Sequence, residues 1–278
     1  MATTELNQTA ADYHAATDII SNSGKECFRK SQALYHGQYV AKTIPWPEPT
    51  PALKMGTWVH TAILEPDVWA AKYICGPVGI DRRTTVGKAQ YLGFCQQAEG
   101  KEIVPAEDWW LVNELREAVM RNELARKFLE APGEVEHSFS WTDDETGLEL
   151  KSRPDKTLAT GLIVDLKTTD DASPESFYRS CLNFGYHRTA AWRGAGHLVR
   201  TGEEASHLFI AISKKTFEVG LYEIKGEVLR LGKEENRRLI DRMAVCYESG
   251  DWAAAWTKQV MAITYPAWAF RSAEWEAE

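Results

Sequence analysis

Two short stretches of the chain, SRPDK (Ser152–Lys156) and VDLKTT (Val164–Thr169), carry the strongest indication of its fold. In a β-strand, side chains two positions apart project from the same face, so Asp165 and Lys167 share one face, whereas Val164 and Leu166 project from the other. Charged side chains at a half-buried strand are costly unless they are paired or bind a metal. Asp155 precedes Asp165 by ten residues, enough chain for a tight reversal that brings the two carboxylates together.

This arrangement is suited to a divalent cation. Mg²⁺ prefers oxygen ligands and keeps several waters, so Asp155, Asp165 and the backbone carbonyl of Leu166 form a plausible ligand set. Lys167 would then lie beside the cation, where it could position an attacking water. Taken alone, however, an aspartate and a lysine two apart on a strand are more often a surface salt bridge.

The surrounding pattern predicts a mixed α/β (α+β) protein whose central mixed β-sheet is flanked by helices. Alternating residues at Glu134–Trp141 and Leu148–Arg153, on either side of the turn-rich Asp143–Gly147, predict a β-hairpin, and Leu162–Lys167 predicts the next strand. The remaining predictions are a proline-rich loop at Thr43–Ala52, helices at Leu53–Glu65, Ala106–Glu130, Pro174–Leu182, Tyr186–Val199 and Glu227–Tyr247, and strands at His207–Ser213 and Phe217–Ile224. We expect one domain over residues 1–278, with a mainly helical part (1–130), a sheet core (131–225) and a C-terminal helix and tail (226–278).

The composition excludes several classes of protein. The chain has 278 residues, of which 44% are hydrophobic and 26% charged, so it is neither disordered nor fibrous. Its 32 basic and 40 acidic residues give a net charge of −8, which argues against non-specific coating of nucleic acid but does not exclude a basic cleft. The five cysteines lack metal-site spacing. No secretory signal or long apolar run is apparent, so we expect a cytoplasmic protein without a membrane segment.

An ordered set of motifs along the chain extends the interpretation of Asp155, Asp165 and Lys167 as a metal-binding site. Pro-Asp followed by Asp-x-Lys on a strand is the PD-(D/E)XK nuclease pattern, and the chain resembles the RecE-like (exonuclease VIII type) exonucleases of that superfamily. The resemblance covers most of the chain and is carried by ATDIISNSGKECFRKS (Ala16–Ser31), KMGTWVHTAILEP (Lys54–Pro66), DRRTTVGKAQ (Asp81–Gln90), EVEHSFSWTDDETGLELKSRPDK (Glu134–Lys156), IVDLKTT (Ile163–Thr169) and YPAWA (Tyr265–Ala269). It implies the PD-(D/E)XK nuclease fold.

The resemblance also implies roles for individual residues. It makes His60, Asp155 and Asp165 metal ligands and Lys167 the catalytic lysine. Spacing alone does not connect His60 with Asp155, and a lone histidine on a half-apolar helix is more often structural. Imidazole suits Mn²⁺ better than Mg²⁺, so Mg²⁺ is the expected cofactor and Mn²⁺ the alternative.

One helix departs from the family pattern. Relatives of the RecE type usually carry Gln-x-x-x-Tyr in the helix after the metal-binding strand, whereas Thr189 and Arg193 stand at these two positions here. Thr189 retains a hydroxyl that can form hydrogen bonds, and Arg193 adds a cation that could bind a phosphate. The role of this helix is therefore open.

Candidate DNA-binding residues are basic or aromatic side chains near these motifs. Arg153 and Lys156 flank Asp155, and Trp58, near His60, could stack on a base. The other candidates are Tyr186, Arg188, Thr189 and Arg193 on the helix, and Arg82 and Arg83 upstream. The alternative for such basic clusters is an ordinary solvated surface.

The function implied by the resemblance is a metal-dependent exonuclease. It would digest one strand from double-stranded DNA ends in the 5′→3′ direction and leave 3′ single-stranded overhangs for recombination by strand annealing. The expected partners are a RecT-like annealing protein and further copies of the chain in a closed ring. Two alternatives remain: a catalytically weakened protein that binds DNA ends or acts as a scaffold, and a PD-(D/E)XK endonuclease.

Overall fold

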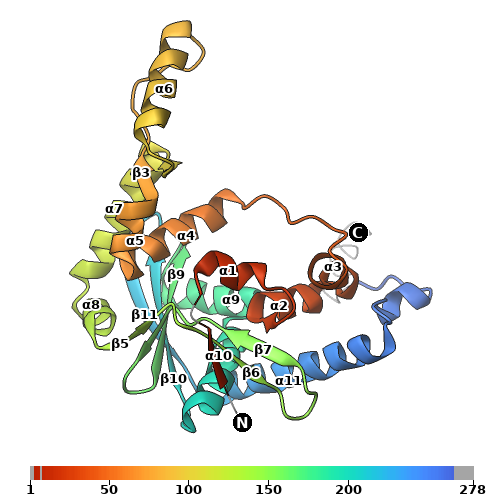
Figure 1. Ribbon diagram of the computed structural model, residues 1–278. Helices are drawn as coiled ribbons and strands as arrows, with labels where there is room; N and C mark the ends of the chain where they lie inside the picture. Colours follow the sequence, from red (N-terminus) through yellow and green to blue (C-terminus); the bar gives the residue numbers. More distant parts are fainter. Residues whose placement is uncertain (1–2, 7, 266–278) are drawn as a thin grey trace, which may run out of the picture.

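A five-stranded mixed sheet forms the centre of the protein (Figure 1). The computed structural model describes residues 3–6 and 8–265, so the acidic end of the chain and all of the YPAWA motif except Tyr265 lie outside the described residues. The strand order is β11 (Val219–Ile224), β10 (Ser206–Ser213), β9 (Leu162–Thr169), β8 (Lys156–Leu158) and β5 (Gly133–Val135). Within this sheet, β9 and β10 pair in parallel and the other neighbouring strands pair antiparallel. The predicted mixed sheet flanked by helices is thus confirmed.

The central strand β9 separates an apolar face from a functional one. Val164 and Leu166 are buried in the main core against Val59 of α4 (Pro51–Leu64) and Leu115 of α7 (Ala106–Arg121). Asp165 and Lys167 project from the opposite face, in register with Phe209 and Ala211 of β10. The alternation expected from the sequence therefore holds, and it presents charged side chains to helix α10 (Tyr186–Thr201).

The strand predicted at Glu134–Trp141 is interrupted. Its first part is β5, which pairs with β8 in the central sheet, whereas its second part is β6 (Ser138–Thr142) of another sheet. The chain changes direction at Glu136, whose φ of 48° lies in the left-handed region and ends regular strand structure. The prediction of a single strand was therefore wrong. Because of the bend, the direction of the Glu136 side chain does not follow from the alternation of a regular strand.

The second sheet has the order β1 (Thr3–Leu6), β6, β7 (Glu149–Ser152) and β2 (Ile20–Ser21). β6 and β7 form the predicted hairpin, whose turn ends at Gly147 with a φ of 70°. This sheet packs through Phe139, Trp141 and Leu150 against Trp192 of α10 and against α11 (Gly226–Ser249). The two helices approach so closely that a Cβ on Gly232 would lie 2.3 Å from the backbone oxygen of His187.

The long helix predicted at Ala106–Glu130 is two helices, α7 and α8 (Glu123–Glu130). Asn122 between them has extended backbone, and its side chain accepts a hydrogen bond of 3.0 Å from the Ala125 N–H. Asparagine is a preferred N-cap, so it begins a new helix where the apolar period alone suggested continuation.

The remaining elements surround the sheets. The N-terminal part contains α1 (Ala10–Ala15), α2 (Asn22–Lys30), α3 (Gln32–Tyr35), the π-helix η1 (His36–Val40) and α5 (Pro66–Lys72); α9 (Pro174–Phe184) precedes α10, and η2 (Ala255–Lys258) follows α11. Helix α4 begins at Pro51, inside the predicted loop, because proline is tolerated in a first helical turn and Thr50 caps it. Within the described part of the chain, no helix is long and apolar enough to span a membrane.

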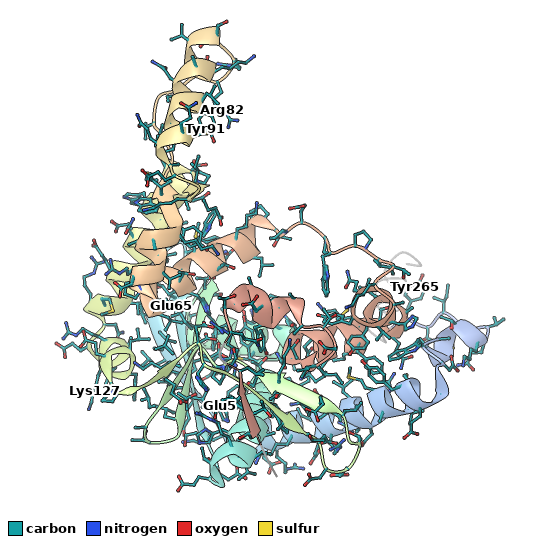
Figure 2. The ribbon with its side chains drawn as sticks, in the orientation of Figure 1. Glu5, Glu65, Arg82, Tyr91, Lys127 and Tyr265 are labelled. Atoms are coloured by element: carbon teal, nitrogen blue, oxygen red, sulfur yellow. The ribbon has the colours of Figure 1, made fainter. Side chains whose placement is uncertain are left out.

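An arm projects from the body of the protein (Figure 1). It contains α6 (Thr85–Gln97), and the parallel strands β3 (Tyr73–Cys75) and β4 (Glu102–Val104) lie at its base. On the arm, the Arg82 guanidinium lies 4.0 Å from the centre of the Tyr91 ring (Figure 2).

Candidate active site

The structure brings together the two aspartates of the sequence motif. Asp155 lies just before β8, and its Oδ2 accepts a hydrogen bond of 2.9 Å from the Leu166 N–H on β9. Asp165 follows the same reversal and lies on the adjacent strand. One guanidinium connects the two: Arg193 donates to Asp155 Oδ1 at 2.7 Å and also to Asp165 Oδ2. The two carboxylates thus share one guanidinium.

His60 reaches the same carboxylate from α4. Its Nδ1 lies 3.4 Å from Asp155 Oδ2, and its side chain is 25% exposed. Burial lowers the pKa of His60, which favours the neutral imidazole. A neutral imidazole is the form that binds a metal, so the structure supplies the contact that spacing could not predict.

Glu136 is a third carboxylate at this site, and the sequence analysis did not identify it. Potential ligand atoms of His60, Glu136 and Asp155 all lie within 4.8 Å of one another. Burial and the nearby negative charge of Asp155 raise the pKa of Glu136 to about 7. The missed signal was the interruption of the strand, because the bend at Glu136 directs the side chain inward.

Lys167 completes the motif on β9. Its ammonium contacts Asp165 Oδ1, and its side chain is 19% exposed. The nitrogen lies 5.4 Å from the centre of the Tyr186 ring and 5.9 Å from that of Phe209. These aromatic rings limit the directions available to the ammonium and hold it beside the carboxylates.

The charges at the site stabilise one another. Burial opposes ionisation of Asp155, but positive neighbours, led by Arg193, hold its pKa below the ordinary value. Burial also opposes the charge of Arg193, but Asp165 and Asp155 raise its pKa further. Both groups are therefore charged, and buried charges of this kind require partners or a metal.

The donor set matches a hard divalent cation. His60, Glu136 and Asp155 offer an imidazole nitrogen and carboxylate oxygens, which are ligands for Mg²⁺ or, because of the histidine, Mn²⁺. Ligation by Asp165, which lies outside this group of ligand atoms, stays a prediction. Leu166 contacts Asp155 through its N–H, and ligation by its carbonyl stays a prediction. The residues present fit the cation that the sequence analysis expected.

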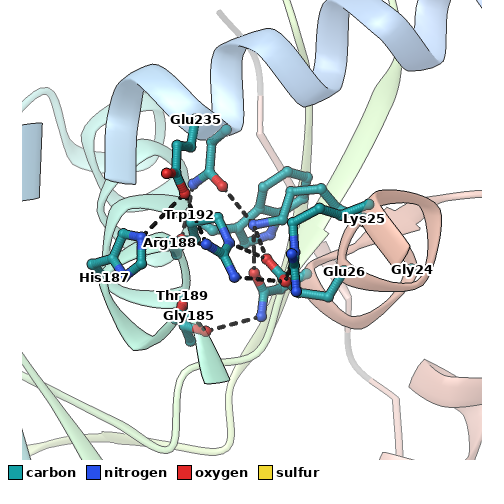
Figure 3. Close-up of polar contacts among 12 residues, drawn as sticks. Gly24, Lys25, Glu26, Gly185, His187, Arg188, Thr189, Trp192 and Glu235 are labelled. Atoms are coloured by element: carbon teal, nitrogen blue, oxygen red, sulfur yellow. Dashed lines mark hydrogen bonds and ion pairs between the residues drawn. The ribbon is translucent and has the colours of Figure 1, made fainter. Parts of the chain in front are cut away.

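Two candidate DNA-binding residues are part of a partly buried network within the protein (Figure 3). Arg188 donates to Glu26 of α2 at 2.7 and 3.0 Å and to Glu235 of α11 at 2.8 Å. Thr189 accepts a hydrogen bond of 3.2 Å from Asn22. These contacts connect α2, α10 and α11. The donors of Arg188 are thus used within the protein, and its contact with DNA stays a prediction.

The basic residues beside Asp155 are also engaged within the protein. Lys156 is buried and donates to the backbone carbonyl of Leu129. Arg153 donates to Glu136 and to Ser138, both at 2.8 Å. Lys156 is thus not available to a phosphate, whereas Arg153 acts on the site indirectly by holding Glu136.

The other DNA-binding candidates lie apart from the carboxylates or inside the core. Trp58 is buried, and its Nε1 donates to Glu102 at 3.1 Å, so it offers no face to a base. Tyr186 stacks on Phe209 with ring centres 5.5 Å apart. Arg82 and Arg83 lie on the arm, where Arg83 pairs with Asp81. Among these candidates, only Arg193 contacts the aspartates.

Replacing Glu136 with glutamine should weaken Mn²⁺ binding by about 10- to 100-fold, the range found when groups that support a metal site are lost. The amide retains the size of the side chain and removes its negative charge. Isothermal titration calorimetry with Mn²⁺ would measure the change. Glu134→Gln is the matched control, because Glu134 lies two residues earlier and pairs with Arg200 instead. Equal affinities for Glu136→Gln and the wild type would contradict the assignment.

Comparison with known proteins gives a family and a similar structure for this chain. Residues 21–257 match the family described as "PDDEXK-like domain of unknown function (DUF3799)". No curated protein matches the sequence. A crystal structure of a candidate exonuclease from Eubacterium rectale is similar with a TM-score of 0.60 and 13% identity, over 94% of this chain and 96% of that one. A second structure, SSO0001, has 13% identity over 66% of this chain and 85% of that one, but its TM-score of 0.28 carries no argument.

The family match and the structural match support one another. The family match extends over most of the described chain and includes Asp155, Asp165 and Lys167. The similar crystal structure has nearly the same extent, which supports the same mixed α/β fold. The chain therefore belongs to the PDDEXK-like (DUF3799) family.

Proposed function

We propose that the protein is a metal-dependent deoxyribonuclease that hydrolyses phosphodiester bonds at the ends of double-stranded DNA. The observation that carries this proposal is the convergence of Asp155, Asp165 and Lys167 on one face of the sheet in a member of the PDDEXK-like family. The similarity to a candidate exonuclease over nearly the whole of both chains is additional support for action at ends.

Each residue has a distinct role in this proposal. Asp155, Asp165, Glu136 and His60 would hold the cation, Mg²⁺ or Mn²⁺. When bound, such a cation polarises a phosphate and lowers the pKa of water. The Lys167 ammonium has three N–H donors and contacts Asp165, and in this proposal it would orient the attacking water.

The finer features of the proposal rest on the RecE-like resemblance. We propose 5′→3′ digestion that leaves 3′ single-stranded overhangs, which a RecT-like annealing protein would use in recombination. We also propose a ring of identical subunits around the DNA. A ring threaded by a DNA end is compatible with the net charge of −8, because contacts can be confined to its interior.

A comparison of linear and circular DNA tests the activity. With Mg²⁺ or Mn²⁺, the protein should degrade a linear duplex and leave a covalently closed circle intact. A duplex labelled at its 5′ ends should release the label early, because digestion begins there. Gel electrophoresis and the released label measure both results. Release of the label only after the rest of the strand has been degraded would contradict the proposed direction.

Two other functions predict different results in this assay. Cleavage of the closed circle would support an endonuclease. Retained binding to DNA ends without hydrolysis would support an end-binding or scaffold protein. The structure offers one observation for that last function, since Arg193 engages both aspartates expected to bind the metal.

A further inference from the structure

Each oxygen of the Asp155 and Asp165 carboxylates already has a hydrogen-bond partner within the protein. Arg193 contacts one oxygen of Asp155 and one of Asp165. The second oxygen of Asp165 contacts Lys167, and that of Asp155 accepts the Leu166 N–H at 2.9 Å. Arg193 is the group that spans the gap between the aspartates, with a side chain only 13% exposed.

The charges of this cluster balance without a metal. Two carboxylates, Asp155 and Asp165, face two cations, Arg193 and Lys167. A divalent cation would add two positive charges to a cluster that is already neutral. Two cations near the same carboxylates repel one another strongly in a buried environment, so they compete for the same oxygens.

We propose that Arg193 is a built-in counter-ion that holds Asp155 and Asp165 together in the metal-free protein and must release at least one of them when the metal binds. The proposal rests on the metal-dependent function proposed above. A neutral side chain at position 193 would not compete with the metal.

The released guanidinium would need a new negative partner. A phosphate of the bound DNA strand is such a partner, and arginine binds phosphate through two parallel N–H groups. Metal and DNA should therefore bind cooperatively, since each favours the state in which Arg193 has left the aspartates. In the absence of DNA, metal binding is weakened by the cost of displacing Arg193.

Mn²⁺ binding in the absence of DNA tests the competition directly. Arg193→Gln should bind Mn²⁺ about 10-fold or more tightly than the wild type, because a neighbouring cation shifts such equilibria by one to three powers of ten. Arg193→Lys should be intermediate, since it keeps the charge but cannot bridge two carboxylates. Arg200→Gln is the matched control: it lies on the same helix and pairs with Glu5 and Glu134.

Thermal unfolding is a second measurement of Mn²⁺ binding, and it can also be applied to a variant that is less stable than the wild type. Without metal, Arg193→Gln leaves two buried carboxylates facing each other, so its Tm should fall. Saturating Mn²⁺ should then raise its Tm by more than it raises that of the wild type. A non-hydrolysable phosphorothioate duplex should tighten Mn²⁺ binding to the wild type more than to Arg193→Gln.

Three outcomes would overturn the proposal. The first is Mn²⁺ binding by Arg193→Gln and Arg193→Lys that is no tighter than that of the wild type. The second is a gain in Mn²⁺ affinity for Arg200→Gln that equals the gain for Arg193→Gln, because the loss of any positive charge on the helix would then explain both. The third is no Mn²⁺ binding by any variant. Mn²⁺ binding without DNA hydrolysis would contradict the nuclease function alone, so the two failures are distinguishable.

Discussion

Asp165→Asn should lower the rate of metal-dependent DNA cleavage by about 100- to 1,000-fold, the loss typical when one strong electrostatic contact to a transition state is removed. Asp165 is buried on β9 and contacts both Lys167 and Arg193. The amide keeps the shape of the side chain but cannot balance a divalent cation. Single-turnover cleavage of a linear duplex with saturating Mg²⁺ would measure the loss.

Asp170→Asn is the control for this substitution. Asp170 follows the end of β9, is 61% exposed, and pairs with Lys214 and Lys215 on the surface. Its loss removes the same charge from the same region and should leave the rate within about twofold, because exposed ion pairs contribute little. Comparable rates for the two variants would exclude Asp165 from the reaction. Circular dichroism would establish that both variants are folded.

Trp192→Ala should destabilise the protein by about 3–5 kcal/mol, the usual cost of removing a large buried aromatic side chain. Trp192 is 2% exposed on α10, and its ring centre lies 5.7 Å from that of Trp141. Its Nε1 donates to the Lys151 carbonyl at 2.9 Å, so alanine removes this buried hydrogen bond as well as leaving a cavity. Urea denaturation followed by far-ultraviolet circular dichroism would measure the free energy of unfolding.

Two further variants separate the causes of this loss. Trp192→Phe keeps most of the ring volume and loses the N–H, and the Lys151 carbonyl keeps the Tyr13 hydroxyl as a donor, so about 0.5–1.5 kcal/mol of the effect should remain. Trp110→Ala removes a tryptophan that is 58% exposed on α7 and should change stability by no more than about 1 kcal/mol. A similar loss for Trp110→Ala and Trp192→Ala would contradict the assignment of Trp192 to the core.

Local patterns predicted the sheet and the central motif well. The alternation over β9, the hairpin of β6 and β7, and the helices α9, α10 and α11 follow from periods of two and about 3.6 residues. Local patterns were less successful where one side chain changes the direction of the chain. Asn122 divides a predicted helix, and Glu136 divides a predicted strand.

The predicted DNA-binding residues show a second limit of prediction from sequence. Arg188 and Lys156 are basic and close in sequence to the motif, yet both are directed into the protein. The partner of Arg188, Glu26, is 162 residues away in the chain. No local pattern indicates such a pairing, because it depends on how α2 packs against α10.

The sequence alone therefore determined that Asp165 and Lys167 share a face of a strand, because the side-chain period of a strand is a local property. Spacing in the chain also placed Asp155 within reach of them. Only the tertiary structure decided that Glu136 and His60 reach the same site and that Arg193 bridges the aspartates. The reason is that a side chain's charge is set by its own chemistry, whereas its partner is set by elements that meet only when the sheets and helices pack together.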